Sequence, residues 1–282
     1  RHTRYIGDWS SDVCSSDLSA DNRIDLVARN ITVAAGKGND TIVIVDALAA
    51  VDGGDGTDTI ILQWFGNGAP GDDRGYELSL AKAGMAQTGP ARTGSITIDR
   101  IENVDGSVGD DKLTGDGGVN VLSGGLGNDV LVGGGGNDRL YGDVRDPLDP
   151  LQTAAGDPGH FRSAPGFADL LEGGTGDDWI DGGEGFDTVS YRNATGAVLV
   201  DLGAGSARGA DGSDTLTNVE AVLGSAFADT LTGDDGDNLL DGGGGKDTMA
   251  GGKGNDIYVI NRVDEVIVEK AGEGSEIGRA HV

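Results

Sequence analysis

Aspartate and glycine recur with a nine-residue spacing, most clearly between Gly124 and Tyr141. This stretch reads GGLGNDVLV followed by GGGGNDRLY. Each copy has the form G-G-x-G-x-D-x-U-x, where U is a large apolar residue, here Leu131 and Leu140. A carboxylate from Asp129 or Asp138, together with main-chain carbonyls, offers the oxygen ligands that a hard cation such as Ca²⁺ prefers, about six to eight in number. The residue types and their spacing therefore indicate calcium chemistry.

The remaining positions of the pattern predict the backbone that would hold such a cation. Glycine at positions one, two and four allows positive φ in a tight turn, which directs carbonyls toward a common point. The final x-U-x is a short strand whose middle side chain points inward. One turn and one strand make half a coil, so residues eighteen apart stack on the same side. We expect the cation to lie between stacked turns.

The same half-coil can be followed through much of the chain. Near-consensus turns are AGKGND from Ala35, GGDGTD from Gly53, GGTGDD from Gly173, GGEGFD from Gly182, GGGGKD from Gly242 and GGKGND from Gly251. Weaker copies begin at Gly106, Gly115, Gly224 and Gly233. The inward apolar position keeps step with them at Leu113, Leu122, Leu131, Leu140, Leu171, Ile180, Val189, Leu231, Leu240, Met249 and Tyr258.

Position six and the glycine carbonyls are the predicted metal ligands. The side chains are Asp40, Asp58, Asp111, Asn120, Asp129, Asp138, Asp169, Asp178, Asp187, Asp229, Asn238, Asp247 and Asp256. The carbonyls are those of Gly36, Gly38, Gly54, Gly56, Gly125, Gly127, Gly134, Gly136, Gly174, Gly176, Gly183, Gly185, Gly243, Gly245, Gly252 and Gly254. Asn120 and Asn238 carry no charge, so their sites are expected to be weaker. A glycine-rich solenoid without metal is the alternative, and it predicts no preference for Asp at position six.

These motifs resemble the RTX, or haemolysin-type, calcium-binding repeat family. The resemblance covers about half of the residues. It implies an all-β fold, a parallel β-roll in three segments with short antiparallel strand modules between them. It also implies a calcium-folded module of a larger secreted bacterial protein, which leaves the cell through a one-step exporter. In the family such rolls often lie beside a metalloprotease, lipase, epimerase or adhesin segment.

Composition narrows the classes of partner. Twenty basic residues against 48 acidic ones give a net charge of −28, which disfavours nucleic acid and anionic membrane surfaces. No run of apolar residues is long enough to predict a membrane span, and no secretory leader is evident. Neither HExxH nor GxSxG occurs, so we expect no catalytic residues in this chain. An adhesin and the C-terminal part of a secreted enzyme remain alternatives for the parent protein.

The two ends are expected to be non-native. Asp12 to Leu18 reads DVCSSDL and Glu276 to Val282 reads EIGRAHV. One DNA string encodes the first peptide and its reverse complement encodes the second, and this string resembles a sequencing-library adapter. We therefore expect residues 1–18 and 276–282 to be adapter-derived tails. The only cysteine, Cys14, then lies outside the genuine protein.

The expected order of modules follows from where the nine-residue period holds and fails. Lead-in strands and a first roll span 19–61, a strand module 62–105, a second roll 106–190, another strand module 191–223, and a third roll with a cap 224–275. A proline-rich loop, 143–168, interrupts the second roll and contains His160, which we expect to be solvent-exposed. Trp64 is expected to cap the first roll, with carbohydrate binding as its alternative. A longer repeat relates Ile101 to Val219, at an offset of 118 residues.

Overall fold

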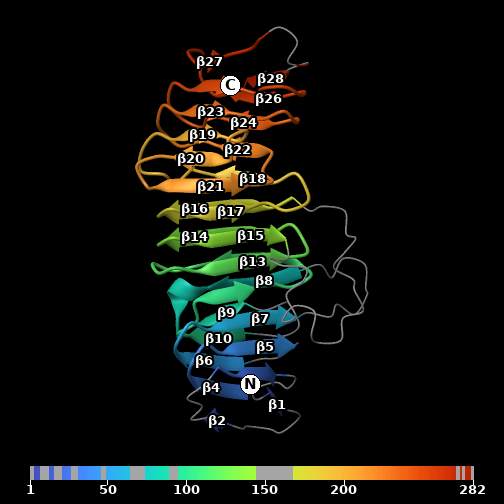
Figure 1. Cartoon of the computed structure of the whole chain (residues 1–282), viewed down its shortest axis with the longest axis vertical. Coiled ribbons are helices and arrows are strands. Elements are labelled where there is room, and N and C mark those ends of the chain that lie inside the picture. Colours follow the sequence, from blue (N-terminus) through green and yellow to red (C-terminus); the bar gives the residue numbers. More distant parts are fainter. Residues whose placement is uncertain are drawn as a thin grey trace. The chain divides into compact units, whose positions relative to one another are not determined.

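The computed structural model describes residues 3–6, 13–15, 21–26, 31–45, 49–63, 74–88, 95–143, 168–270, 274 and 277–280. Trp64, Phe65, His160 and almost all of the loop 143–168 lie outside these residues. The described part of the chain has strands and one short 3₁₀ helix, η1 (Leu80–Lys82), but no α-helix. The chain divides into two compact units, one comprising residues 1–131 and 143–164 and the other comprising residues 132–142 and 165–282. Most strand pairs within each unit are parallel, which confirms an all-β, parallel β-roll fold (Figure 1).

The first unit has two facing sets of strands. One set has the order β1 (Thr3–Ile6), β3 (Arg23–Leu26), β5 (Thr41–Val45), β7 (Thr59–Gln63), β11 (Asn103–Asp105) and β13 (Val121–Gly125). The other has the order β2 (Val13–Ser15), β4 (Ile31–Lys37), β6 (Ala49–Asp55), β10 (Ser95–Asp99), β9 (Ala86–Thr88), β8 (Arg74–Ser79) and β12 (Asp110–Thr114).

The second unit is built in the same way. One set has the order β15 (Arg139–Asp143), β17 (Trp179–Asp181), β21 (Ser213–Thr217), β20 (Ser206–Arg208), β19 (Leu199–Asp201), β23 (Thr230–Thr232), β25 (Thr248–Ala250) and β27 (Val266–Ile267). The other has the order β14 (Val130–Gly135), β16 (Leu170–Thr175), β18 (Thr188–Ser190), β22 (Ala221–Leu223), β24 (Leu239–Asp241), β26 (Ile257–Ile260) and β28 (Ile277–Ala280).

The eighteen-residue coil is the register of the uninterrupted parts. Thr41 pairs with Thr59 and Leu239 pairs with Ile257, each eighteen residues along the chain. Strand β27 keeps this register, since Thr248 pairs with Val266, so the roll continues past Val259. The lead-in strands β3 and β4 also belong to it, because each pairs with the coil that follows and not with the other.

In the nonapeptide half-coils the core is a single column of inward side chains per strand set, whereas the early strands bury more, as β5 buries Ile42, Val43 and Ile44. All the apolar positions predicted from the nine-residue period are at most 1 % exposed: Leu113, Leu122, Leu131, Leu140, Leu171, Ile180, Val189, Leu231, Leu240, Met249 and Tyr258. One side chain of each half-coil faces inward because strand side chains alternate between two faces. Each of these nonapeptide coils therefore buries little apolar area, and its stability depends on the contacts made at the turns.

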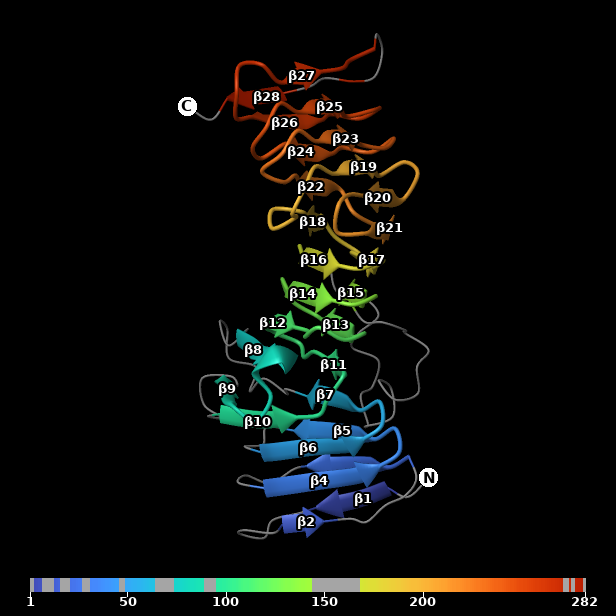
Figure 2. The same cartoon turned by 90° about the vertical axis from the view of Figure 1, so that its left-hand side faces the viewer.

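Each unit contains one antiparallel meander inserted in one strand set. In the first unit, β8, β9 and β10 pair antiparallel, with β10 beside β6 and β8 beside β12 (Figure 2). In the second unit, β19, β20 and β21 do the same between β17 and β23. The opposite set continues without an insertion, β7 to β11 and β18 to β22. The antiparallel strands predicted in both modules are thus present.

Strands at the two chain ends depart from the coil register. Thr3 pairs with Arg23, Val13 with Thr32, and Ile257 with Ile277, which are offsets of 20, 19 and 20 residues. The interior offset is eighteen, as between Arg23 and Thr41. Main-chain hydrogen bonds can add almost any segment to an open sheet edge. The irregular offsets are what we expect of segments that do not carry the repeat.

Candidate metal centres

The predicted position-six side chains all lie inside the turns. Each of the thirteen is buried, and none is more than 3 % exposed. Each one immediately precedes a strand, as Asp58 precedes β7 and Asp247 precedes β25, except Asp111, which is the second residue of β12. An ionised carboxylate is rarely buried to this degree unless it is paired, hydrogen-bonded or bound to a metal. What each carboxylate contacts therefore decides what its turn can do.

A ladder of hydrogen bonds connects stacked turns through these carboxylates. The main-chain N–H of Asp40 donates to Oδ1 of Asp58 at 2.7 Å. The same bond joins other position-six residues: Asp111 to Asp129 at 2.7 Å, Asp169 to Asp187 at 2.8 Å, Asp229 to Asp247 at 2.9 Å and Asn238 to Asp256 at 2.9 Å. These residues are eighteen apart and stacked as the period predicts. Asp138 donates to Asp178 across the longer loop, at 2.8 Å.

Three acidic residues outside the consensus extend this ladder. Oε2 of Glu102 accepts the N–H of Asp58 at 2.7 Å, and Oε2 of Glu220 accepts that of Asp187 at 2.9 Å. Oδ1 of Asp214 accepts the N–H of Asp178 at 3.1 Å. These residues lie outside position six, so the nine-residue period alone does not identify them. Glu102 and Glu220 are 118 residues apart, so the longer repeat could have identified them.

The glycines divide into two roles. Positions two and four have positive φ as predicted, for example +107° at Gly54 and +118° at Gly245. Gly185 is the exception among the predicted carbonyl ligands that the structure describes. Position one does not have positive φ, so that part of the prediction is wrong. Glycine is needed there for space, because a Cβ at Gly173 would lie within 3.0 Å of Oδ2 of Asp178.

One carboxylate oxygen in several consensus turns has no donor. Among the described residues, Oδ2 of Asp40, Asp58, Asp178 and Asp247 is buried without a hydrogen-bond partner. Burial raises the pKa of Asp58 and of Asp247 to about 6, from the ordinary 3.8. A buried acceptor without a donor is costly, whereas a divalent cation would satisfy it. The residues present therefore fit a bound cation.

A comparison with protein families decides what these turns are. A model of the RTX calcium-binding nonapeptide repeat matches the chain four times, over residues 98–131, 114–144, 166–190 and 223–258. These residues are RTX calcium-binding nonapeptide repeats. RTX repeats indicate calcium binding in a structural module, and such a domain is not catalytic. No curated protein sequence matches this chain.

The RTX matches do not include the turns between Ala35 and Asp58, although the geometry there is the same. Gly36 and Gly38 have φ of +110° and +112°, and Asp40 donates to Asp58 as in the matched copies. The matched and unmatched turns thus form one structural class.

Cation ligands in these RTX turns have to come largely from the main chain. In the described part of the chain no three His, Cys, Asp or Glu side chains converge on one point. A cation between two turns would therefore meet one or two carboxylates, and glycine carbonyls would have to complete the oxygen set that Ca²⁺ requires. This accounts for both the glycine content and the single acidic position of the repeat.

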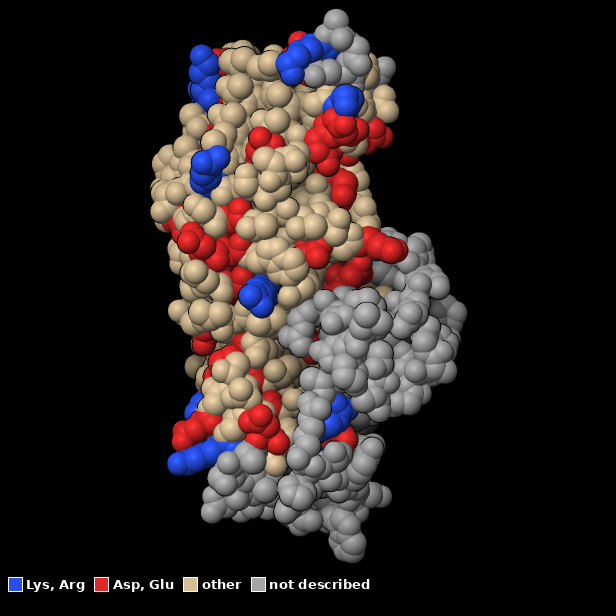
Figure 3. All heavy atoms as spheres, in the orientation of Figure 1, with Lys and Arg blue, Asp and Glu red and all other residues tan. Residues whose placement is uncertain are grey.

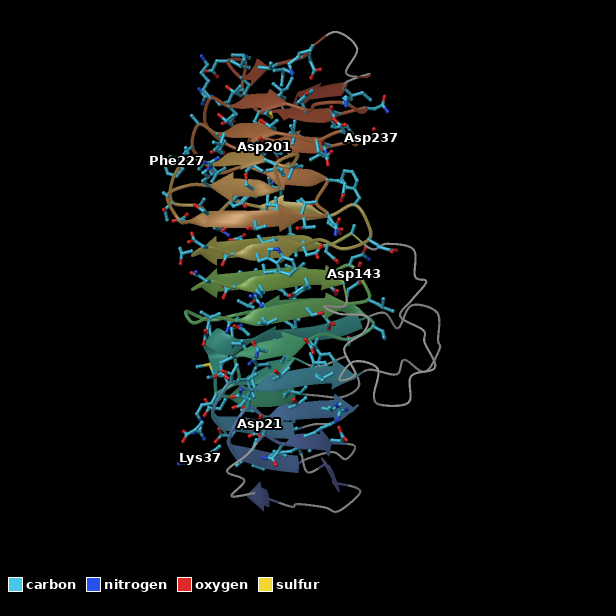
Figure 4. The ribbon with its side chains drawn as sticks, viewed as in Figure 1. Asp21, Lys37, Asp143, Asp201, Phe227 and Asp237 are labelled. Atoms are coloured by element: carbon cyan, nitrogen blue, oxygen red, sulfur yellow. The ribbon has the colours of Figure 1, made fainter. Side chains whose placement is uncertain are left out.

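A second ladder runs along position five on the outside of the RTX turns. Asn39 donates its N–H to Oδ1 of Asp21 at 2.9 Å, and Asn255 donates to Oδ1 of Asp237 at 2.7 Å. Asp21 and Asp237 are labelled in Figure 4, on turns of the two units. The bond runs from each turn to the one before it, opposite to the position-six ladder. Recurrent Asn and Asp at position five are its signal in the sequence.

The charged side chains on the visible surface are mostly acidic. The face drawn in Figure 3 shows Asp and Glu in both units and only a few basic side chains. Among the described residues the basic side chains mostly pair with nearby acids, as Arg100 does with Asp52 at 2.5 Å. Among the described residues no helix is long and apolar enough to span a membrane.

Proposed function

We propose that the consensus turns bind several calcium ions and that this binding folds the chain. The buried carboxylate oxygens without donors, at Asp40, Asp58, Asp178 and Asp247, carry this proposal. The ligands would be the position-six carboxylates of the consensus turns together with carbonyls of the glycines at positions two and four. A cation would supply positive charge directly to these oxygens.

Electrostatics gives calcium control over folding. Adjacent strands are about 4.8 Å apart. Two carboxylates at that distance repel by about 1 kcal/mol in water, and by about 3 to 4 kcal/mol at an effective dielectric constant of 20. In the nonapeptide coils the apolar column that opposes this repulsion has one side chain per half-coil. Each site saturated at one hundred times its dissociation constant adds about 2.7 kcal/mol, so several sites reverse the balance.

This balance suits a module that works outside the cell. Low cytosolic calcium keeps the chain unfolded and competent for a one-step exporter, and the higher external concentration then folds it. The parent protein would be secreted, with any catalytic or adhesive segment outside the residues of this chain. The net charge of −28 is consistent with a chain that needs cations to fold.

Circular dichroism of the chain tests the proposal. We expect coil in chelator and sheet in millimolar Ca²⁺. Mg²⁺ should substitute poorly because it demands a tighter octahedral shell. Isothermal calorimetry on Asp178→Asn should show at least one fewer ion than the unmodified chain. A cooperatively melting sheet in chelator, together with no measurable calcium binding, would refute the proposal.

A further inference from the structure

Four half-coils that follow the two meanders lack glycine at position two. The residues there are Ser107 and Asp116 in the first unit, and Ser225 and Asp234 in the second. None of them has positive φ, since Arg100 and Asn218 are the only described residues other than glycine that do. In consensus turns the glycine at this position has φ near +100°, for example +101° at Gly174. The peptide at position two is therefore oriented differently in these four turns.

Serine at position two forms hydrogen bonds with the carboxylate oxygens of the aspartate at position six. Ser225 donates its N–H to Oδ2 of Asp229 at 2.6 Å, and its hydroxyl lies 2.8 Å from Oδ1 and 3.0 Å from Oδ2. Oδ1 also accepts the N–H of Val198 at 2.8 Å. Both oxygens of Asp229 are thus occupied by the chain's own donors.

The equivalent turn of the first unit repeats this arrangement. Ser107 donates its N–H to Oδ2 of Asp111 at 2.5 Å, and its hydroxyl lies 3.0 Å from the same oxygen. Oδ1 accepts the N–H of Tyr76. Asp111 and Asp229 are 118 residues apart, so both long repeats contain the same serine–aspartate contact.

Aspartate at position two donates its main-chain N–H to the amide oxygen of the asparagine at position six. Asp116 donates its N–H to Oδ1 of Asn120 at 2.8 Å, and Asp234 donates to Oδ1 of Asn238 at the same distance. The amide nitrogens donate in turn to the carbonyls of Glu102 and Glu220, at 2.9 and 3.3 Å. The asparagine oxygen that a cation would need is thus already hydrogen-bonded.

We propose that the residue at position two decides whether a half-coil takes a cation. Glycine with positive φ turns its N–H away from position six and leaves a carboxylate oxygen for calcium. Serine or aspartate directs its N–H onto the position-six side chain, and the turn closes without metal. On this proposal, which rests on the calcium function proposed above, residues 106–120 and 224–238 form metal-free coils at the start of the second and third rolls.

Calcium counts on two aspartate variants provide the first test. We expect Asp247→Asn to lower the number of ions bound per chain by at least one. Asp229→Asn is expected to leave that number unchanged at saturating calcium, with circular dichroism confirming the sheet. An equal loss in both variants would overturn the inference. If the unmodified chain binds no calcium, the proposed function fails, and that outcome is distinguishable from the first.

A serine pair tests the same inference without changing any carboxylate. Ser225→Gly permits positive φ and removes the hydroxyl, so we expect it to gain one calcium ion per chain. Ser225→Ala also removes the hydroxyl but keeps the backbone conformation and its N–H, so we expect no gain. A gain in both variants, or in neither while both give the calcium-loaded sheet, contradicts control by position two.

Discussion

Oε2 of Glu102 accepts the main-chain N–H of Asp58 at 2.7 Å, across 44 residues of sequence. This glutamate takes the place of a position-six aspartate where the meander interrupts the roll. Glu220 does the same for Asp187, at 2.9 Å. In both cases the insertion leaves the ladder intact because a longer side chain supplies the next acceptor.

Shortening Glu220 should break its hydrogen bond with the main-chain N–H of Asp187. Glu220→Asp withdraws the acceptor by one methylene and leaves the buried N–H of Asp187 unpaired, which should cost about 1 to 2 kcal/mol of the free energy of unfolding. Chemical denaturation in saturating calcium measures it. Glu77→Asp is the control, because its side chain is 57 % exposed and its ion pair with Lys112 is a surface one. Equal losses in the two variants would contradict the role of Glu220.

Alanine at position one should be far more damaging than alanine at an open turn. A Cβ at Gly173 would collide with the Asp178 carboxylate, whereas one at Gly117 meets nothing within 4 Å. We expect Gly173→Ala to cost about 3 kcal/mol, the upper range for overpacking, and Gly117→Ala to cost little. Thermal melts in calcium compare them. Matching melting temperatures would show that the space at position one is not needed.

Acidification should stabilise the calcium-free chain. Burial raises the pKa of Asp58 to about 6 and that of Asp111 to about 7, from 3.8. The folded chain then binds more protons than the unfolded chain, so this contribution to the free energy of unfolding is full below about pH 4 and is lost as pH rises through 6 to 7. Circular dichroism in chelator should show more sheet at pH 5 than at pH 8.

High salt separates this effect from surface repulsion. One molar salt screens exposed charges and acts much less on buried ones, so the pH dependence should persist. Sheet content that rises with pH in chelator would contradict the buried, raised pKa values.

Tyr258 should contribute through its hydroxyl as well as its ring. The hydroxyl accepts the N–H of Gly251 at 2.6 Å and contacts Glu269, while the side chain is 1 % exposed. Tyr258→Phe keeps the apolar ring and leaves a buried N–H without its acceptor. We expect a loss of about 1 to 2 kcal/mol in denaturant melts. An unchanged midpoint would mean that Gly251 finds another acceptor.

The periodic parts of this protein follow from sequence because a strict nine-residue repeat fixes both the turn and the inward side chain. Leu113 and Met249 were predicted as core from spacing alone and are fully buried. The strand order of the meanders was not predictable, since β10 lies beside β6 through contacts between distant segments. The turn that contains Ser107 reads in the sequence as a weak copy of the repeat. Only the backbone angle of Ser107 and its hydrogen bond to Asp111 give this serine a separate role.

The equal division of each coil between two strand sets has a consequence for changes in chain length. Deleting residues 233–250 removes one whole coil and leaves every later strand in the strand set to which it belonged before. Deleting only residues 242–250 would remove β25, shift β26 into its place beside β23 and exchange the sides of every turn after it. Insertions and deletions should therefore be tolerated in steps of eighteen residues. A change by an odd multiple of nine residues would move every later strand into the opposite strand set.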